Sequence, residues 1–517
     1  MSVGGGARAG QGTGWGNRGA GTSARRVALD VLRAVQADDA YANLLLPVRI
    51  RRAGLSPRDA AFATELTYGT IRMIGTYDAI IEAASGRLVA NVEEDVLDVL
   101  RLGVHQLVGM RTPSHAAVSQ TVDLTGAIGA RRATGFVNAV LRKVAARTAA
   151  EWDTVIAEGL SGDDLLATRW SHPRWVIVAL RDALAAERAR DELVALLAAD
   201  NAPPRVSLVA LPGLAERTEA IAAVAAAADE SGLVPEGAAA PEGAEVTPSL
   251  PPADQAEEAA PPMRSARAVE PPVSPVGVRG VIGDPARIPA VAEGRMRVQD
   301  EGSQLAALAL SRASTVRPGE RWLDLCAGPG GKAALLAAEA RRTGAALVAN
   351  ELAPARVGLV RQALAQFDDV VRVVQGDGRR FGAAGTTERF DRILLDAPCT
   401  GLGALRRRPE ARWRKQPEDV TELAELQTEL LDAAVGALAA GGTLAYVTCS
   451  PHLGETRGQV DAVMRRHGDV LEQLDTAGIV RGIAARDPQV ADGPTVQLWP
   501  HRIGTDAMFI ALFRRTS

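Results

Sequence analysis

From residue 295 onward, short apolar segments alternate with helical segments, and this alternation limits what the chain can fold into more than any other feature. The apolar segments lie at residues 321–325, 346–350, 370–375, 392–396 and 443–448. Strands separated by helices pair in parallel, with helices on both faces of the sheet. The carboxyl ends of parallel strands meet at one crevice, where ligands bind. The sequence therefore predicts a Rossmann-like α/β domain over residues 296–517, with its functional residues at the strand ends.

The first part of the chain predicts a separate, all-α domain. Apolar residues recur at helical spacing over residues 25–35 and again over residues 96–108, and Ser56-Pro57 is a typical helix start. We expect a disordered, glycine-rich tail at residues 1–23 and a helical domain at residues 24–148.

A connector subdomain is expected between these two domains, over residues 149–295. It begins with helices and enters a strand near residues 203–208. Residues 234–276 contain ten prolines and no aromatic residue. Such a segment buries too little apolar area to offset its chain entropy, so it is predicted to be a disordered insertion. The chain as a whole is therefore expected to be a multi-domain protein.

Cysteine and charge content narrow the classes of function. The 517 residues include only three cysteines, and neither these nor the six histidines are spaced as metal ligands. We expect a monomeric, cytoplasmic protein without disulfides, metal, signal peptide or membrane span. The net charge of −4 is unevenly distributed, at +6 over residues 1–150, −11 over residues 151–300 and +1 over the remainder. Both ends of the chain are therefore available to a polyanion.

A glycine-rich turn follows the first predicted strand of the α/β domain. It consists of Cys326, Ala327, Gly328, Pro329, Gly330, Gly331 and Lys332, and a helix begins near its end. Glycines at such a turn let a ligand approach the backbone closely. The spacing is neither GxGxxG nor that of a phosphate-binding loop.

Acidic residues follow the next two strands. Glu351 closes the second strand, where an acidic residue characteristically binds ribose hydroxyls, and Asp377 closes the third, where it can meet an adenine amino group. Together with the turn they predict S-adenosylmethionine, because its adenosine needs these contacts while its sulfonium needs no phosphate cradle.

The two other cysteines follow the fourth and fifth strands. Cys399 lies in Asp396-Ala397-Pro398-Cys399 and Cys449 in Thr448-Cys449-Ser450-Pro451, so both border the same crevice. A thiolate can add to C6 of a pyrimidine and make C5 able to take an electrophilic methyl group, and loss of the C5 proton then expels the thiolate. Lys332 and Asp396 can polarise the ring through its carbonyl oxygen and exocyclic amine. Spacing alone does not rank the two cysteines, whereas Cys326 is expected to pack within its turn.

These motifs resemble the Nop/Sun family of RNA cytosine-C5 methyltransferases, in particular its bacterial members that act on small-subunit (16S) ribosomal RNA. In the catalytic part the resemblance rests on residues 299–304, 326–332, 377–379, 396–401, 427, 448–451 and 504–509. The N-terminal helices resemble a NusB-type RNA-binding domain through residues 65–72 and 136–142, and residues 171–175 match the connector of this family. The resemblance covers most of the chain and implies a class I methyltransferase domain behind a NusB-like domain.

The resemblance also implies roles that the residues alone leave open. It implies that Cys449 is the nucleophile that attacks C6, and that Cys399 assists breakdown of the adduct and product release. It implies that Asp396 and Lys332 hold the target base. The residues implied to hold S-adenosylmethionine are Cys326, Ala327, Gly328, Pro329, Gly330, Gly331, Lys332, Glu351, Asp377 and Asp396.

RNA would be engaged through an unpaired or flipped cytosine, because the target carbon lies on a base edge. Residues 406–408 and 412–415 are basic and follow Cys399 closely, so they are predicted to contact phosphates, with Trp413 stacking on a base. His452 and His501 are as consistent with structural roles as with a general base. The run of acidic residues that the family usually has after the second cysteine is reduced here to Gly454-Glu455-Thr456, and no role is assigned to it.

Two other functions stay open, and a third is disfavoured by the motifs. A transfer-RNA cytosine-C5 methyltransferase of the same family would share the chemistry. An RNA-binding ribosome-assembly factor with a non-catalytic methyltransferase fold is a second, although Cys399, Cys449, Lys332 and Asp396 argue against it. A DNA cytosine methyltransferase would place its nucleophile after the fourth strand and would lack the Thr-Cys-Ser-Pro element.

Overall fold

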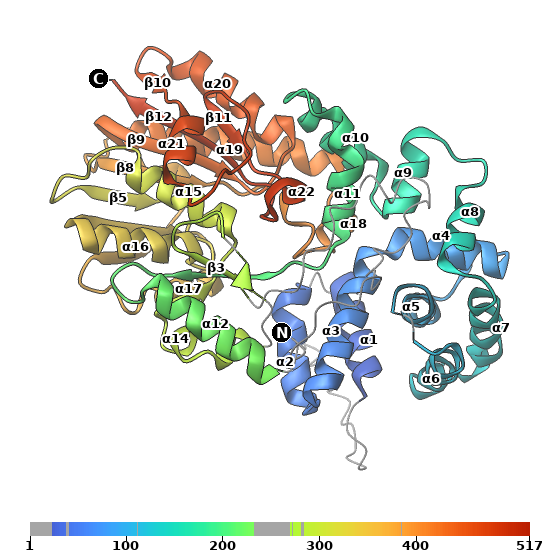
Figure 1. Ribbon diagram of the computed structural model, residues 1–517. Coiled ribbons are helices and arrows are strands. Elements are labelled where there is room, and N and C mark those ends of the chain that lie inside the picture. The colour runs from blue at the N-terminus through green and yellow to red at the C-terminus, as the bar shows by residue number, and fades with distance from the viewer. Residues whose placement is uncertain are drawn as a thin grey trace, which may run out of the picture.

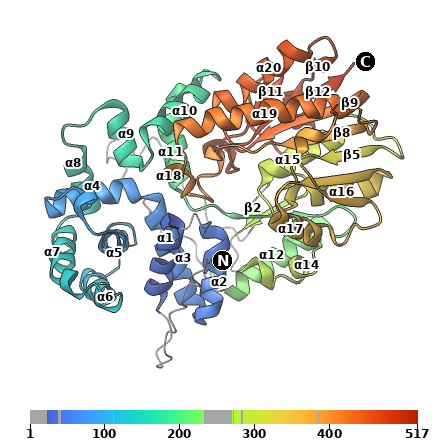
Figure 2. The same cartoon turned by 180° about the vertical axis from the view of Figure 1, so that it is seen from behind.

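The computed structural model describes residues 23–37, 41–110, 112–231, 269–270, 272–280, 284–383 and 385–516. Helices alone make up the N-terminal part of the chain, whereas the C-terminal part is a sheet between two layers of helices (Figure 1). Figure 2 shows the same two parts from behind. This architecture is the one predicted from the sequence.

The N-terminal domain has one apolar core shared by its helices. These helices are α1 (Ala24–Ala37), α2 (Ala42–Ala53), α3 (Pro57–Arg72), α4 (Ile74–Ser85), α5 (Glu94–Val104), α6 (Ser114–Ala127) and α7 (Thr134–Ala145), with a π-helical turn η2 (His105–Gly109) after α5. The predicted helical segments fall in α1 and in α5 with η2. Ser56 caps α3, because its hydroxyl accepts a hydrogen bond from the amide of Asp59 at 3.1 Å, as expected of a helix start.

The connector continues with helices and then forms a small antiparallel sheet. The helices are α8 (Ala149–Ala157), α9 (Gly162–Trp170), α10 (Arg174–Ala185) and α11 (Leu193–Asn201). The sheet has the strand order β2-β3-β1-β4, with β1 (Val206–Ala210), β2 (Val269–Glu270), β3 (Gly277–Gly280) and β4 (Met296–Val298), and it is accompanied by α12 (Arg217–Ser231) and α14 (Pro289–Ala292). β1 confirms the strand predicted near residue 206.

The predicted insertion at residues 234–276 needs a correction at its end. Residues 232–268 lie outside the described residues, as do residues 1–22 of the predicted tail. Residues 269–270, however, form β2, and Val273 is buried in the core of the catalytic domain. The carboxylate of Glu301 accepts hydrogen bonds from the amides of Val273 and, at 3.0 Å, Ser274. This contact with a distant glutamate orders a segment whose composition predicts disorder.

The catalytic domain is built on a mixed sheet with the strand order β7-β6-β5-β8-β9-β12-β10, in which β11 also pairs with β12. β5 (Arg321–Asp324), β6 (Ala346–Glu351), β7 (Val371–Gln375), β8 (Phe390–Asp396) and β9 (Leu438–Thr448) are parallel and confirm the five predicted strands. The sequence did not predict β10 (Leu471–Gln473), β11 (Thr495–Gln497) and β12 (Phe509–Arg515), which add antiparallel to the edge beside β9.

Helices cover both faces of this sheet. α15 (Glu301–Arg312), α16 (Gly331–Thr343), α17 (Pro354–Leu364) and α21 (Thr476–Ile483) pack on one face, and α19 (Pro417–Ala437) and α20 (Arg457–His467) pack on the other. Successive strand residues point to opposite faces of the sheet. Leu394 therefore packs in the core with α15 and α16, while its neighbours Ile393 and Leu395 pack in the core with α19 and α20. Among the described helices none is long and apolar enough to cross a membrane.

The short helix α18 (Ala411–Arg414) joins the catalytic domain to the helical domain, and this corrects the predicted RNA contact of residues 412–415. Arg412 is fully buried and donates hydrogen bonds to Asn201 at 2.7 Å and to the Ser171 carbonyl at 3.1 Å. The indole of Trp413 donates to the carbonyl of Ile71 at 3.2 Å. Arg412 and Trp413 therefore hold the two domains together, and Arg412 is not available to phosphates, so the prediction for Arg412 is wrong.

Candidate active site

The glycine-rich turn connects β5 to α16 and is shaped by its glycines. Gly328 and Gly330 adopt the left-handed backbone, with φ of 57° and 85°, a conformation that favours glycine. A β-carbon on Gly330 would also lie 2.7 Å from the side chain of Ala363, so α17 packs directly against the turn. The amide of Gly328 donates a hydrogen bond to Glu351 at 3.0 Å. The turn is therefore fixed to the end of β6.

Glu351 lies at the end of β6, where the sequence predicts a ribose ligand. It is buried, and its second carboxylate oxygen accepts a hydrogen bond from the amide of Ala353 at 2.8 Å and pairs with Arg356 at 3.0 Å. Both oxygens thus have protein partners, and a ribose hydroxyl would share them.

Unpartnered polar atoms surround the turn. Gln299, Asp324 and Asn350 are buried, and each has side-chain atoms with no hydrogen-bond partner among the described residues. Burial and the negative charge of Asp396 raise the pKa of Asp324 to about 8. Buried polar atoms without partners are costly unless a ligand or water completes them. These atoms therefore fit a polar ligand on the turn, such as the predicted S-adenosylmethionine.

Asp377 and Cys326 have local roles in this structure. Asp377 caps η6 (Gly378–Arg380) by accepting from the amide of Arg379 at 3.0 Å, and the side chain of Arg379 also binds it, which lowers the pKa of Asp377. Burial raises the pKa of the Cys326 thiol, so at neutral pH this thiol is protonated and unreactive.

Cys399 and Cys449 meet beyond the carboxyl ends of β8 and β9. These strands are parallel neighbours, and the residue opposite Asp396 is Val447. Each cysteine follows its strand closely, which brings the two sulfur atoms to 3.5 Å, within hydrogen-bonding distance. Both are free thiols.

The charges around the two thiols differ. The hydrogen bond from Cys399 and the positive charges of Lys332 and Arg408 outweigh burial and lower the pKa of Cys449. The same hydrogen bond, burial and the negative charges of Glu455 and Asp396 raise the pKa of Cys399. The positive charges of Lys332 and Arg408 thus favour a thiolate on Cys449, whereas the negative charges of Glu455 and Asp396 disfavour one on Cys399.

Lys332 links the glycine-rich turn to β8. It lies in the first turn of α16, is largely buried, and its ammonium group lies 2.7 Å from the carboxylate of Asp396. Burial acts to lower the pKa of Lys332, but the charge of Asp396 and the hydrogen bond to it outweigh burial and raise it. Lys332 is therefore charged at neutral pH, and its charge acts on Cys449.

Comparison with known proteins places this site in a family. A family model described as 16S rRNA methyltransferase RsmB/F matches residues 313–514, and a NusB family model matches residues 22–146. A Mycobacterium tuberculosis protein named as a putative methyltransferase is 44% identical over 95% of this chain and 96% of its own. A Bacillus subtilis protein named as a probable ribosomal RNA small subunit methyltransferase B is 30% identical over 96% of this chain and 99% of its own.

The chain belongs to the RsmB/F methyltransferase family.

The fold of this RsmB/F methyltransferase also matches a solved structure. The crystal structure of a protein called PH0851 covers 95% of this chain and 98% of its own, with a TM-score of 0.71 at 21% identity. This likeness supports the arrangement of the helical and catalytic parts.

Glu455 is a part of the methyltransferase site that sequence reasoning missed. It is fully buried and joins the loops that carry the two cysteines. Its carboxylate accepts hydrogen bonds from the amide and hydroxyl of Thr400, at 2.8 and 2.5 Å, and from the hydroxyl of Ser450 at 2.6 Å. Gln427 donates to it at 3.3 Å and to the Pro398 carbonyl at 2.8 Å. The signal available in the sequence was the position of this acidic residue, shortly after Cys449 and Ser450.

The loop after Cys399 is tied to the rest of the site by a glycine and an arginine. The amide of Gly403 donates to the carbonyl of Cys449 at 2.8 Å, and a β-carbon there would lie 2.1 Å from the carbonyl oxygen of Ala507. Arg407 binds Asp300 and Asp506 at 2.8 and 2.9 Å. The motifs at residues 299–304 and 504–509 therefore hold this loop. Because Arg407 is paired with these two aspartates, it is not available to RNA phosphates, and the predicted phosphate contact of Arg407 is wrong.

The two histidines singled out in the sequence have structural partners. His452 accepts a hydrogen bond from the amide of Gly454 at 3.1 Å, and His501 pairs with Glu192 at 2.6 Å. In the described part of the chain, no group of three or more His, Cys, Asp or Glu residues could hold a metal ion.

Proposed function

We propose that this methyltransferase transfers the methyl group of S-adenosylmethionine to C5 of a cytosine in small-subunit ribosomal RNA, through a covalent bond between Cys449 and C6. The observation that carries the proposal is the thiol pair, with its sulfur atoms 3.5 Å apart and with the charge of Lys332 lowering the pKa of Cys449. The names and family of the relatives supply the RNA substrate.

The cofactor would be held on the glycine-rich turn. Residues 326–332 and Glu351 supply its backbone and carboxylate contacts, Asp377 closes the neighbouring strand, and Gln299 and Asp324 offer unpartnered polar atoms. When bound, S-adenosylmethionine supplies an electrophilic methyl group.

The chain's own residues then act on the base. The Cys449 thiolate forms a bond to C6, which makes C5 a nucleophile towards the methyl group. Lys332 and Asp396 hold the polar edge of the ring, where the charged Lys332 ammonium stabilises the negative charge that develops on the ring. Loss of the C5 proton to water then re-forms the C5–C6 double bond from the C5–H electron pair, and the bond between Cys449 and C6 breaks with its electron pair returning to sulfur. We assign to Cys399 the role of assisting this release, since its thiol lies beside the leaving sulfur.

The non-catalytic alternative is disfavoured by this geometry. A vestigial fold has no reason to keep two half-buried thiols side by side, together with a buried ammonium group paired with a carboxylate at the same edge of the sheet. A DNA methyltransferase would use Cys399 as its nucleophile, whereas the charges favour Cys449.

The test is methyl transfer from labelled S-adenosylmethionine to small-subunit ribosomal RNA and to transfer RNA, with 5-methylcytosine mapped in each. Wild type is expected to methylate a cytosine in the ribosomal RNA. Cys449→Ala should abolish both methylation and any covalent protein–RNA species, whereas Cys399→Ala should accumulate a slowly migrating covalent species. The double variant should lose that species again.

Three results would count against the proposal. Methylation confined to transfer RNA would assign the other substrate. Retained methylation in Cys449→Ala would remove the nucleophile assignment. A covalent species that persists in the double variant would show that neither thiol carries the RNA.

A further inference from the structure

Tyr41, the residue before α2, is exposed at the joint between the helical and catalytic domains. Half of its surface is accessible, at 50%. Two arginines of the catalytic domain contact its ring: the guanidinium carbons of Arg408 and Arg414 lie 5.7 and 5.5 Å from the ring centroid. Aromatic rings beside arginines are the surfaces on which unpaired RNA bases stack.

Arg408 connects this ring to the active site. It lies in the loop that follows Cys399, is exposed, and its charge acts on Cys449. Arg406 is buried and Arg407 binds Asp300 and Asp506, so within residues 406–408 only Arg408 presents its guanidinium to solvent. Within the described parts of the chain, the guanidinium of Arg408 makes no hydrogen bond or ion pair and contacts the ring of Tyr41.

The helix that follows Tyr41 is packed in the core of the helical domain, so the backbone that carries the ring is held in place. Ala42 and Leu46 of α2 are buried in the core of the helical domain. Arg414 donates a hydrogen bond to the carbonyl of Val35 at 2.6 Å, which fixes α18 against the same domain. The ring is therefore pre-positioned, which lowers the entropy lost when a ligand binds it.

The exposed face of α2 continues from Tyr41. Leu44 is 63% exposed, and Arg51 and Arg52 in the last turn are exposed. Arg52 follows Tyr41 by about three helical turns and so lies on nearly the same face. Figures 1 and 2 both show α2 on the side of the helical domain that faces the catalytic domain.

We propose that Tyr41 and Arg408 form a binding site for an unpaired nucleotide that flanks the target cytosine, with the base stacked on Tyr41 and its phosphate bound by Arg408. The proposal rests on the proposed RNA substrate. It assigns the RNA contact to a composite surface of both domains, because neither α2 nor the loop after Cys399 supplies the ring and the free guanidinium together.

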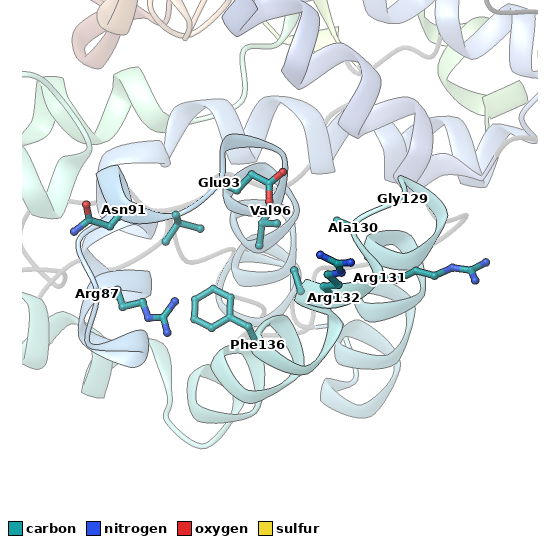
Figure 3. A pocket seen from close by; sticks show the side chains of 11 residues that line it. Arg87, Asn91, Glu93, Val96, Gly129, Ala130, Arg131, Arg132 and Phe136 are labelled. Carbon is teal, nitrogen blue, oxygen red and sulfur yellow. The ribbon is translucent and has the colours of Figure 1, made fainter.

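A second arginine–aromatic pair offers a matched comparison. Arg87 lies 5.1 Å from the ring centroid of Phe136, in a hollow of about 600 Å³ that Arg131 and Arg132 also line (Figure 3). This hollow lies around α5 and α7, which both views show at the end of the helical domain away from the catalytic sheet. A nucleotide there cannot neighbour a cytosine at Cys449.

The experiment measures the affinity of the full-length protein for a single-stranded fragment of small-subunit ribosomal RNA, without S-adenosylmethionine and over a range of salt concentrations. Tyr41→Ala should weaken binding about tenfold or more, whereas Tyr41→Phe, which keeps the ring, should stay within about twofold of wild type. Arg408→Ala should weaken binding and reduce the slope of log K against log salt by about 0.7, the contribution of one phosphate contact on a single strand. Tyr41→Ala should leave that slope unchanged. Arg87→Ala is the control and should match wild type.

The outcomes separate this inference from the proposed function. Suppose that wild type methylates the fragment, and that Tyr41→Ala and Arg408→Ala keep the melting temperature of wild type. If both variants then bind the fragment as tightly as wild type, only the nucleotide site at Tyr41 and Arg408 is overturned. A loss of binding in Arg87→Ala but not in Tyr41→Ala would place the nucleotide in the hollow and overturn it as well. If wild type neither binds nor methylates RNA, both fail.

Discussion

The sharpest consequence of the site geometry concerns Glu455, the buried carboxylate that joins the two cysteine loops. It binds Thr400, the neighbour of Cys399, and Ser450, the neighbour of Cys449, so it sets the separation of the two sulfur atoms. Glu455→Ala removes the acceptor of four donors: the amide and hydroxyl of Thr400, the hydroxyl of Ser450 and the side chain of Gln427, which keeps its bond to the Pro398 carbonyl. The hydroxyls of Thr400 and Ser450 lie 3.1 Å apart and can bond to each other, whereas the Thr400 amide has no substitute.

The magnitude follows from this count of donors. An unsatisfied buried donor costs about 1–3 kcal/mol, so one amide and one hydroxyl without a partner give a destabilisation of about 2–6 kcal/mol. A shift of the cysteine loops by about 1 Å is expected to lower kcat about 100-fold. The KM for RNA should change little, because Glu455 is fully buried and does not face the substrate.

Two further variants make the test decisive. Glu455→Gln keeps the shape and one acceptor for the Thr400 amide, while its NH2 group can donate to the two hydroxyl oxygens, so it should recover most of the stability and of kcat. Glu320→Ala is the control: Glu320 is also buried and binds Arg392 at 2.8 Å, but it lies at the opposite, amino end of β5. It should lower stability with little effect on kcat.

The assay combines urea unfolding with steady-state methyl transfer to ribosomal RNA. If Glu455→Ala loses stability but keeps the kcat of wild type, Glu455 is structural only and the reasoning about sulfur positions is refuted. A Glu455→Gln variant as inactive as Glu455→Ala, with normal stability, would instead show that the charge and not the hydrogen bonds matters.

Two other predictions concern the domain joint and the pH dependence of stability. Arg412→Ala should lower the free energy of unfolding by about 3–5 kcal/mol, because it leaves buried carbonyls without their donor. Lys415→Ala, in the same basic run, should change the free energy of unfolding by less than about 0.5 kcal/mol. Similar effects of the two variants in urea unfolding would contradict the buried role of Arg412. For Asp324, the folded-state pKa of about 8 lies above its ordinary value, so the wild type should lose stability relative to Asp324→Asn as pH rises from about 4 through about 8. Melting temperatures of the cofactor-free proteins at pH 5 and pH 9 check this, and parallel changes in both would contradict it.

Much of the fold and part of the site were predictable because they are written in local patterns. The five parallel strands were found from short apolar runs, and the left-handed turn from its glycines, because both features depend on neighbouring residues. Strand ends then placed Lys332, Asp396, Cys399 and Cys449 at one edge of the sheet. The antiparallel edge strands were missed because β10 and β11 have only three residues each and gain their order from pairing with β12.

Only the tertiary structure could assign the basic run after Cys399. Arg406, Arg407, Arg408 and Arg412 look equivalent as charges, yet three are buried or paired with distant residues and one faces solvent. Burial depends on which surfaces meet, and that information is spread over residues hundreds of positions apart.

Residue types and local patterns are enough to predict the chemistry available at the site: two thiols, an ammonium group and carboxylates at the ends of parallel strands. The tertiary structure decided how that chemistry is distributed, by placing Lys332 and Arg408 near Cys449 and Glu455 near Cys399. The physical reason is that residue types follow from the chain alone, whereas a pKa depends on the distance to charges and on exclusion of water, which exist only once the loops are packed together.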